Sequence, residues 1–225
     1  MDAVGPLQKS EQGNKYVLTF VDSFSEYAEA IPLPDISAVT CARAYETQII
    51  TRHCVNDALV TYNGKSFTAI FFNEVCKILG VKHITTTAYH PAGNGQVERM
   101  HRTMKRALSC DIKASGTNWD EVLPYFLMSN RASPHSTSGY SPFFLLHGRD
   151  MIQLHNHNLR AKLSPDAQRL DEAGKLRKLQ AIISLANKVV RENLRRSRAR
   201  NKRYYDRAAK QSYADRPNCL FTQSD

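Results

Sequence analysis

A nearly continuous apolar run at residues 15–22, Lys-Tyr-Val-Leu-Thr-Phe-Val-Asp, is the feature that most constrains the fold. A strand with apolar residues at successive positions is stable only when both of its faces are covered, which places it in the centre of a sheet. A second strand pattern follows at 27–33 after a serine-containing turn, and Pro32 within it favours an edge position. The two segments predict a hairpin inside an α/β domain.

Helical and strand patterns then alternate along the chain. Helices are predicted at 37–53, 67–79, 95–114 and 119–131, a short helix at 141–148, and strands at 57–62 and 82–87. This order predicts an α/β fold with a mixed five-stranded sheet flanked by helices. We divide the chain into a domain at 1–150, a linker at 151–165, a long basic amphipathic helix at 166–210 and a fraying tail at 211–225.

The net charge of +10 is confined to the last third of the chain. Residues 1–150 contain 14 Lys or Arg and 14 Asp or Glu, whereas residues 151–225 contain 17 and 7, so the second segment carries 17 − 7 = +10. A neutral core with a basic arm is typical of a protein that binds nucleic acid. A solvated basic helix without a partner is the alternative.

Composition also bears on the compartment. No apolar run approaches the length of a membrane span, and no signal peptide opens the chain. The five cysteines are widely spaced, odd in number and free of any Cys-x-x-Cys pair, which favours thiols in a reducing compartment over disulfides or zinc ligands.

Residues 89–100, Tyr-His-Pro-Ala-Gly-Asn-Gly-Gln-Val-Glu-Arg-Met, read as a loop that runs directly into a helix. The first helical turn holds Glu98, which is favourable near the positive end of the helix dipole. Arg102 and Lys105 follow at i+4 and i+7 on the same face, and an apolar face carries Val97, Met100, Met104 and Leu108. A carboxylate at such a junction suggests metal-assisted phosphoryl transfer, which needs further acids at neighbouring strand ends.

Several short motifs occur in a fixed order over residues 1–150. They are Asp2-Ala-Val-Gly-Pro-Leu7, Val21-Asp-Ser-Phe-Ser-Glu-Tyr27, Asn63-Gly-Lys-Ser-Phe67, Thr87-Ala-Tyr-His-Pro91, Gly95-Gln-Val-Glu-Arg99 and His135-Ser-Thr-Ser-Gly-Tyr-Ser-Pro-Phe143. In this order they resemble the catalytic core of retroviral and LTR-retrotransposon integrases, most closely that of gypsy-type elements. The resemblance implies an RNase H-like fold, 3′-end processing and strand transfer of DNA, and two Asp and one Glu that bind Mg²⁺ or Mn²⁺.

By this match Asp2 is the first acid and Glu98 is the Glu, but Tyr62 occupies the position of the second Asp. The interval between positions 62 and 98 is 98 − 62 − 1 = 35 residues, the family's usual spacing. A neutral phenol with a pKa near ~10 is a poor ligand for Mg²⁺, so this copy is expected to be catalytically impaired. Asp2 is preceded only by Met1, so we expect the strand that carries this first acid to fray. Asp22 matches a position that is not a metal ligand in the family, and we expect it to have a structural role.

The resemblance implies that the chain binds DNA and can associate with a second copy of itself. It also implies a nuclear location and no association with a membrane. The residues expected to contact DNA are His90, Gln96, Arg102, Lys105, Arg195, Arg196 and Arg198. Two alternatives remain open at this point: a host-retained DNA- or protein-binding module without catalysis, and an RNase H-like nuclease.

Overall fold

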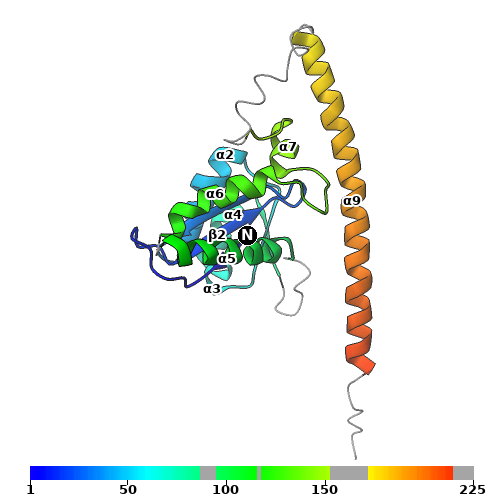
Figure 1. Ribbon diagram of the computed structural model, residues 1–225. Helices are drawn as coiled ribbons and strands as arrows, with labels where there is room; N and C mark the ends of the chain where they lie inside the picture. Colours follow the sequence, from blue (N-terminus) through cyan, green and yellow to red (C-terminus); the bar gives the residue numbers. More distant parts are fainter. Residues whose placement is uncertain (87–94, 116–117, 153–171, 215–225) are drawn as a thin grey trace, which may run out of the picture.

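The computed structural model describes residues 1–86, 95–115, 118–152 and 172–214 (Figure 1). Predictions on His90, on residues 153–171 and on the end of the tail at 215–225 therefore lie outside the described residues. An antiparallel sheet has the order β1 (Asp2–Val4), β2 (Tyr16–Val21) and β3 (Ala28–Leu33), and β4 (Ala58–Thr61) pairs in parallel with β5 (Lys82–Thr85).

The central strand predicted from the apolar run is confirmed. Strand β2 lies between β1 and β3, and β3, which contains Pro32, is an edge strand of this sheet. Successive β2 side chains point to opposite faces: Val17 joins one apolar cluster, and Leu18 and Phe20 join the other. The apolar run therefore supplies both cores.

The predicted single five-stranded sheet is wrong in detail, because the five strands form a three-stranded and a two-stranded sheet. A hydrogen bond connects the two: the Met1 ammonium donates to the Val60 carbonyl oxygen at 2.7 Å. Strand β1 is only three residues long, so it offers few backbone groups to β4 beyond this contact. The contact nevertheless sets the start of β1 beside β4.

One face of the antiparallel sheet is covered by helices from the first half of the chain. Helix α1 (Ala38–Tyr45) continues through a π-helical turn (Glu46–Ile50) into α2 (Thr51–His53). The helix predicted at 67–79 is instead two helices, α3 (Lys65–Thr68) and α4 (Ile70–Ile78), because Ala69 between them is extended with ψ 143°. Buried Tyr45 and Phe72 pack in the core beneath these helices.

Helices α5 (Gly95–Ser115) and α6 (Trp119–Ala132) cover the other face. The apolar face predicted for α5 is confirmed, since its members are all buried: Val97, Met100, Met104 and Leu108. Trp119 Nε1 donates to the Gln8 carbonyl oxygen at 2.8 Å, and the buried Asp120 carboxylate accepts from Ser10 Oγ at 2.6 Å. These bonds tie the start of α6 to the connection between β1 and β2.

Helix α9 (Glu172–Ala214) stands beside the core as a long rod, and its C-terminal part extends past it (Figure 1). It docks near α7 (Pro142–His147) through a buried stripe that includes Val190. Gly148 ends α7 with φ +70°, a backbone conformation that favours glycine, and a Cβ there would lie 2.7 Å from Cδ1 of Ile183 in α9, so that side chain would have to shift. No described helix is long and apolar enough to cross a membrane.

Candidate active site and DNA-binding surface

Asp2, the first predicted acid, is held in place. It pairs with Thr19 in the β1–β2 ladder, and its Oδ1 accepts a hydrogen bond from the Ala3 N–H at 2.8 Å. The expectation that this residue frays is therefore wrong, because the strand pairing fixes the residue. Burial raises the pKa of the Asp2 carboxyl, and the Glu98 carboxylate raises it further, against lowering by the Ala3 bond, the Met1 ammonium and Lys105.

Glu98 lies in the first turn of α5 and is exposed. Its electrostatic effect on the pKa of Asp2 places it near that carboxyl, although the two come from elements 96 positions apart (98 − 2 = 96). The fold thus brings together two of the residues that the resemblance assigned to catalysis.

Tyr62 follows directly after β4 and is 48% exposed. It lies two residues beyond Val60, whose carbonyl oxygen accepts from Met1, and Asp2 is the residue after Met1. The phenol and the first acid therefore flank one contact between strands. The third position of the site holds a neutral side chain at the surface.

The available donors do not fit a pair of magnesium ions. Two hard cations require several carboxylates, and the described residues contain no group of three or more His, Cys, Asp or Glu side chains placed to hold a metal ion. Asp2 and Glu98 supply two carboxylates, and Tyr62 supplies none.

His101 is a site residue that the sequence motifs did not single out. It is 9% exposed, and its Nε2 lies 2.6 Å from Thr19 Oγ1, while its Nδ1 lies 3.8 Å from Asp2 Oδ2. Burial lowers the pKa of His101 to about 4, and the positive charges of Lys105 and the Met1 ammonium contribute. The signal available in the sequence was its spacing, three residues after Glu98 on one helix.

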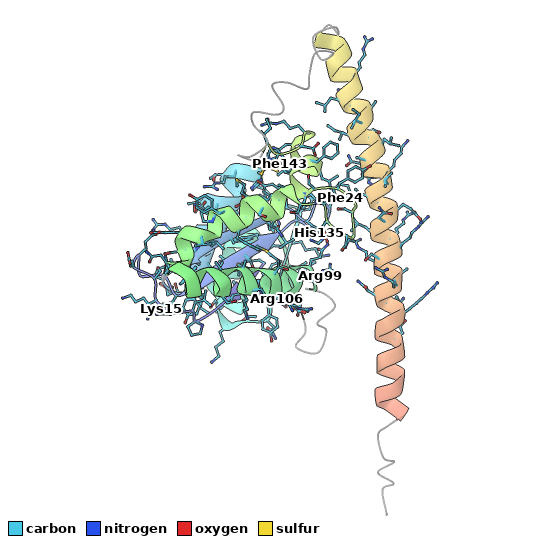
Figure 2. All side chains as sticks on the ribbon, in the orientation of Figure 1. Lys15, Phe24, Arg99, Arg106, His135 and Phe143 are labelled. Atoms are coloured by element: carbon cyan, nitrogen blue, oxygen red, sulfur yellow. The ribbon has the colours of Figure 1, made fainter. Side chains whose placement is uncertain are left out.

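A second acid–histidine pair lies on another side of α5. Glu26 is buried with φ +59°, its Oε2 forms a close ion pair with His135 Nδ1, and its Oε1 lies 3.7 Å from Arg99 Nη2. Gln96 Nε2 donates to Glu26 Oε1 at 3.3 Å, so this predicted DNA contact turns toward the core. Arg99 and His135 lie at the end of α5 that faces α9 (Figure 2).

The same side of α5 borders a cavity of about 300 Å³. Its lining includes three arginines at helical spacing, Arg99, Arg102 and Arg106, together with Thr103 and Asn130. The predicted DNA-contact residue Arg102 is thus one of three exposed cations on this wall. The predicted contact Lys105 is exposed and acts electrostatically on Asp2 and His101.

A larger cavity of about 750 Å³ lies between the core and α9. Its walls include Gln96 and Arg99 at the start of α5 and Arg198 of α9. The predicted contacts Arg195, Arg196 and Arg198 are all exposed, but Arg196 Nε is already bonded to Glu192 Oε1 at 2.8 Å. The basic part of α9 therefore shares a cavity with the start of α5, and Asp2 and Glu98 are not among the residues that line this cavity.

The structural role predicted for Asp22 is observed in the turn between β2 and β3. Its Oδ2 accepts hydrogen bonds from the Phe24 N–H at 3.2 Å and from the N–H and Oγ of Ser25, both at 2.7 Å. A carboxylate with these three donors stabilises the turn that presents Glu26.

Comparison with protein families supports the resemblance drawn from the sequence. Residues 1–91 match the integrase core domain family. The chain is 31% identical over 206 residues to a retrovirus-related Pol polyprotein from transposon 412 of Drosophila melanogaster, which covers 92% of the chain and 16% of that protein. It is also 36% identical over 137 residues to the Pol polyprotein of radiation murine leukemia virus, covering 60% of the chain and 23% of that protein. The chain thus spans less than a quarter of the length of either relative.

Solved structures confirm the fold class. A chain of the simian T-cell lymphotropic virus intasome in complex with the PP2A regulatory subunit B56 gamma superposes with a TM-score of 0.57 at 20% identity, covering 65% of this chain and 53% of that one. The HTLV-2 integrase catalytic core domain in complex with magnesium gives a TM-score of 0.51 at 20% identity, covering 63% and 91%. The α/β, RNase H-like architecture predicted from the sequence is therefore shown, and so is the resemblance to integrase cores.

Proposed function

We propose that this chain, whose residues 1–91 match the integrase core domain family, is a retroelement-derived DNA-binding protein with impaired strand transfer. The observation that carries the proposal is the incomplete acid set. The Glu98 carboxylate contributes to the raised pKa of Asp2, whereas the third position holds the half-exposed phenol of Tyr62.

DNA binding is supported by the distribution of cations around α5 and α9. Arg99, Arg102 and Arg106 border one cavity, and the exposed Arg195 and Arg198 lie on the helix that flanks the core. Cations that neutralise phosphates release counterions, which makes such binding strongly salt-dependent. A nuclear location follows for a protein that acts on chromosomal DNA, and we include it in the proposal.

A strand-transfer assay with Mn²⁺ tests the catalytic part. The unmodified chain is expected to give no more joined product than Glu98→Gln, and Tyr62→Asp is expected to raise product by at least about tenfold, a barrier reduction of about 1.4 kcal/mol. The double variant Tyr62→Asp/Glu98→Gln is the control and should lose that gain. Glu98-dependent joining by the unmodified chain would overturn the claim of impairment, and failure of Tyr62→Asp to restore product would show that another defect limits the reaction.

A salt titration of duplex binding tests the DNA part. The double variant Arg195→Gln/Arg198→Gln is expected to weaken binding and to reduce the slope of log affinity against log salt by about 0.9 for each phosphate that is no longer neutralised. Lys77→Gln is the matched control. Lys77 is an exposed lysine of α4, not of α9, and its Nζ lies 3.7 Å from Glu74 Oε1. Binding that does not respond to salt, or that is unchanged in the double variant, contradicts the role of the basic helix.

A further inference from the structure

The cavity of about 300 Å³ beside α5 has one wall made of three arginines. Arg99, Arg102 and Arg106 follow one another at i, i+3 and i+7, so they lie along one side of the helix, and Figure 2 labels the first and the last. Asn130 of α6 and His135, which follows that helix, also line the cavity. The arginines therefore border a space between two elements, which distinguishes them from a row of cations on an open helix surface.

The charges in this lining do not balance. Among the described residues that line the cavity, Glu26 is the only acid, and it is buried in contact with His135, with Arg99 3.7 Å away. No acid in the described part of the chain forms an ion pair with Arg102 or Arg106, and both residues are exposed. Three guanidinium groups and one carboxylate leave a charge of 3 − 1 = +2, without counting His135. Like charges at i and i+4 of a helix repel each other, so a bound dianion would relieve this repulsion.

Buried apolar side chains are also part of the lining. Ala28 and Met100 both belong to it. Apolar walls of low dielectric strengthen the field of nearby charges, and a cleft lined by one sign of charge concentrates ions of the other sign. The volume is at the lower end of the range found for small-ligand pockets, which begins at about 300 Å³. The cavity is therefore suited to a small anion, or to one charged end of a larger molecule.

Guanidinium groups favour anions that can accept two parallel hydrogen bonds, such as phosphates and carboxylates. A phosphate monoester carries about −1.5 to −2 charges at pH 7. Each phosphodiester of a DNA backbone carries a single negative charge. The charge of +2 in the cavity therefore matches the monoester better than it matches a backbone phosphate.

We propose that the cavity between α5 and α6 binds a phosphate monoester through Arg102 and Arg106, with Asn130 as a neutral donor. The proposal rests on the proposed function, because it names the phosphate group that these two arginines take. The same group occurs in a free nucleotide and at the phosphorylated 5′ end of a DNA strand, and the experiment separates these two sources.

Titration calorimetry of the full chain at low salt with thymidine 5′-monophosphate tests the proposal. We expect one molecule to bind per chain, and the dinucleotide TpT, which has a phosphodiester and no monoester, to bind at least about tenfold more weakly. Arg102→Gln/Arg106→Gln is expected to abolish binding. Arg43→Gln, at an exposed arginine of α1 that lines neither cavity, is the matched control and should bind as the unmodified chain does. Circular dichroism checks that each variant is folded.

A charge placed in the lining tests whether the ligand lies between the two helices. Asn130→Asp nearly keeps the shape of the side chain, and its carboxylate should weaken binding by at least about tenfold because it repels the phosphate. Ser129→Asp adds the same charge at the neighbouring exposed position, which is not in the lining, and should change the affinity by no more than about twofold. Equal weakening by the two variants would overturn the proposal, because the anion would then respond only to the overall charge of this side of the protein.

A second titration identifies the source of the phosphate by comparing a single DNA strand that has a 5′-phosphate with the same strand that has a 5′-hydroxyl. Binding of the phosphorylated strand that is at least about tenfold tighter, and that loses this advantage in Asn130→Asp, assigns the cavity to strand ends. Equal binding of the two strands, together with binding of thymidine 5′-monophosphate, assigns it to free nucleotides.

The proposal is also overturned if thymidine 5′-monophosphate does not bind, if TpT binds as tightly, or if Arg102→Gln/Arg106→Gln leaves binding unchanged. Each of these results leaves the proposed DNA binding standing, because a duplex with unphosphorylated 5′ ends tests it separately. Failure of duplex binding leaves the phosphate site standing, because the nucleotide is titrated in the absence of DNA.

Discussion

Two acid–histidine pairs lie on different sides of α5, and they differ in which protein groups surround the carboxylate. Glu26 is in close contact with His135. Its Oε1 also accepts a hydrogen bond from the Gln96 amide and lies 3.7 Å from the Arg99 guanidinium. Asp2 receives the Ala3 N–H on one oxygen, while its other oxygen faces His101 at 3.8 Å without a hydrogen bond. The first, which we call the closed pair, has Arg99 and Gln96 of the protein beside its carboxylate, whereas the second, the open pair, leaves two acceptors facing each other.

The largest expected effect comes from opening the closed pair. Glu26→Gln removes a buried carboxylate and leaves His135 and Arg99 without their counter-charge, which should lower the free energy of unfolding by about 3 kcal/mol. Urea denaturation followed by circular dichroism measures it. The matched control is Glu192→Gln, because Glu192 also pairs with an arginine, Arg196, but is half exposed; it should cost less than about 0.5 kcal/mol. Equal losses in the two variants would show that burial does not distinguish these pairs.

The middle effect is a pH dependence of stability at the open pair. The pKa of His101 is lowered from 6.5 to about 4 in the folded protein. As the pH falls, this imidazole is therefore protonated in the unfolded chain before it is protonated in the folded protein. The contribution is therefore fully present above about pH 6.5 and is lost as the pH falls toward about 4. In the presence of a chelator, the unmodified chain should lose about 2 kcal/mol more than His101→Asn between about pH 7.5 and about pH 4.5. Parallel pH profiles for the two proteins would contradict the burial of a neutral imidazole.

Local patterns predicted much of the framework on which these two pairs stand. The apolar run in β2 and the apolar face of α5 are periodic signals that depend on neighbours in sequence, and both are confirmed. The closed pair escaped prediction because Glu26 and His135 are 135 − 26 = 109 positions apart and meet only when α5 and α6 pack on the sheet. The break at Ala69 escaped because residues 67–79 carry a helical apolar pattern on both sides of it.

The candidate site also has features that the sequence predicts and features that depend on contacts between distant segments. Asp2, Glu98 and the position of Tyr62 could be assigned by the match of motifs and their spacing. That Asp2 is fixed in a paired strand follows from its pairing with Thr19, and the orientation of His101 follows from the same threonine. These are contacts between segments, so no property of residues 1–4 alone could have shown that the first acid is ordered.

The smallest expected effect concerns Gln96, which the sequence assigned to DNA and the structure directs toward Glu26. Its amide donates to Glu26 Oε1 at 3.3 Å and to the Ser23 carbonyl oxygen at 3.4 Å, and both bonds are long. Gln96→Ala should therefore lower the free energy of unfolding by at most about 1 kcal/mol. Duplex affinity should stay within about twofold of the unmodified chain if Gln96 serves the closed pair, since a twofold change corresponds to only about 0.4 kcal/mol. Unchanged stability with a tenfold loss of affinity would instead assign Gln96 to DNA, and would mean that its side chain leaves Glu26 when DNA binds.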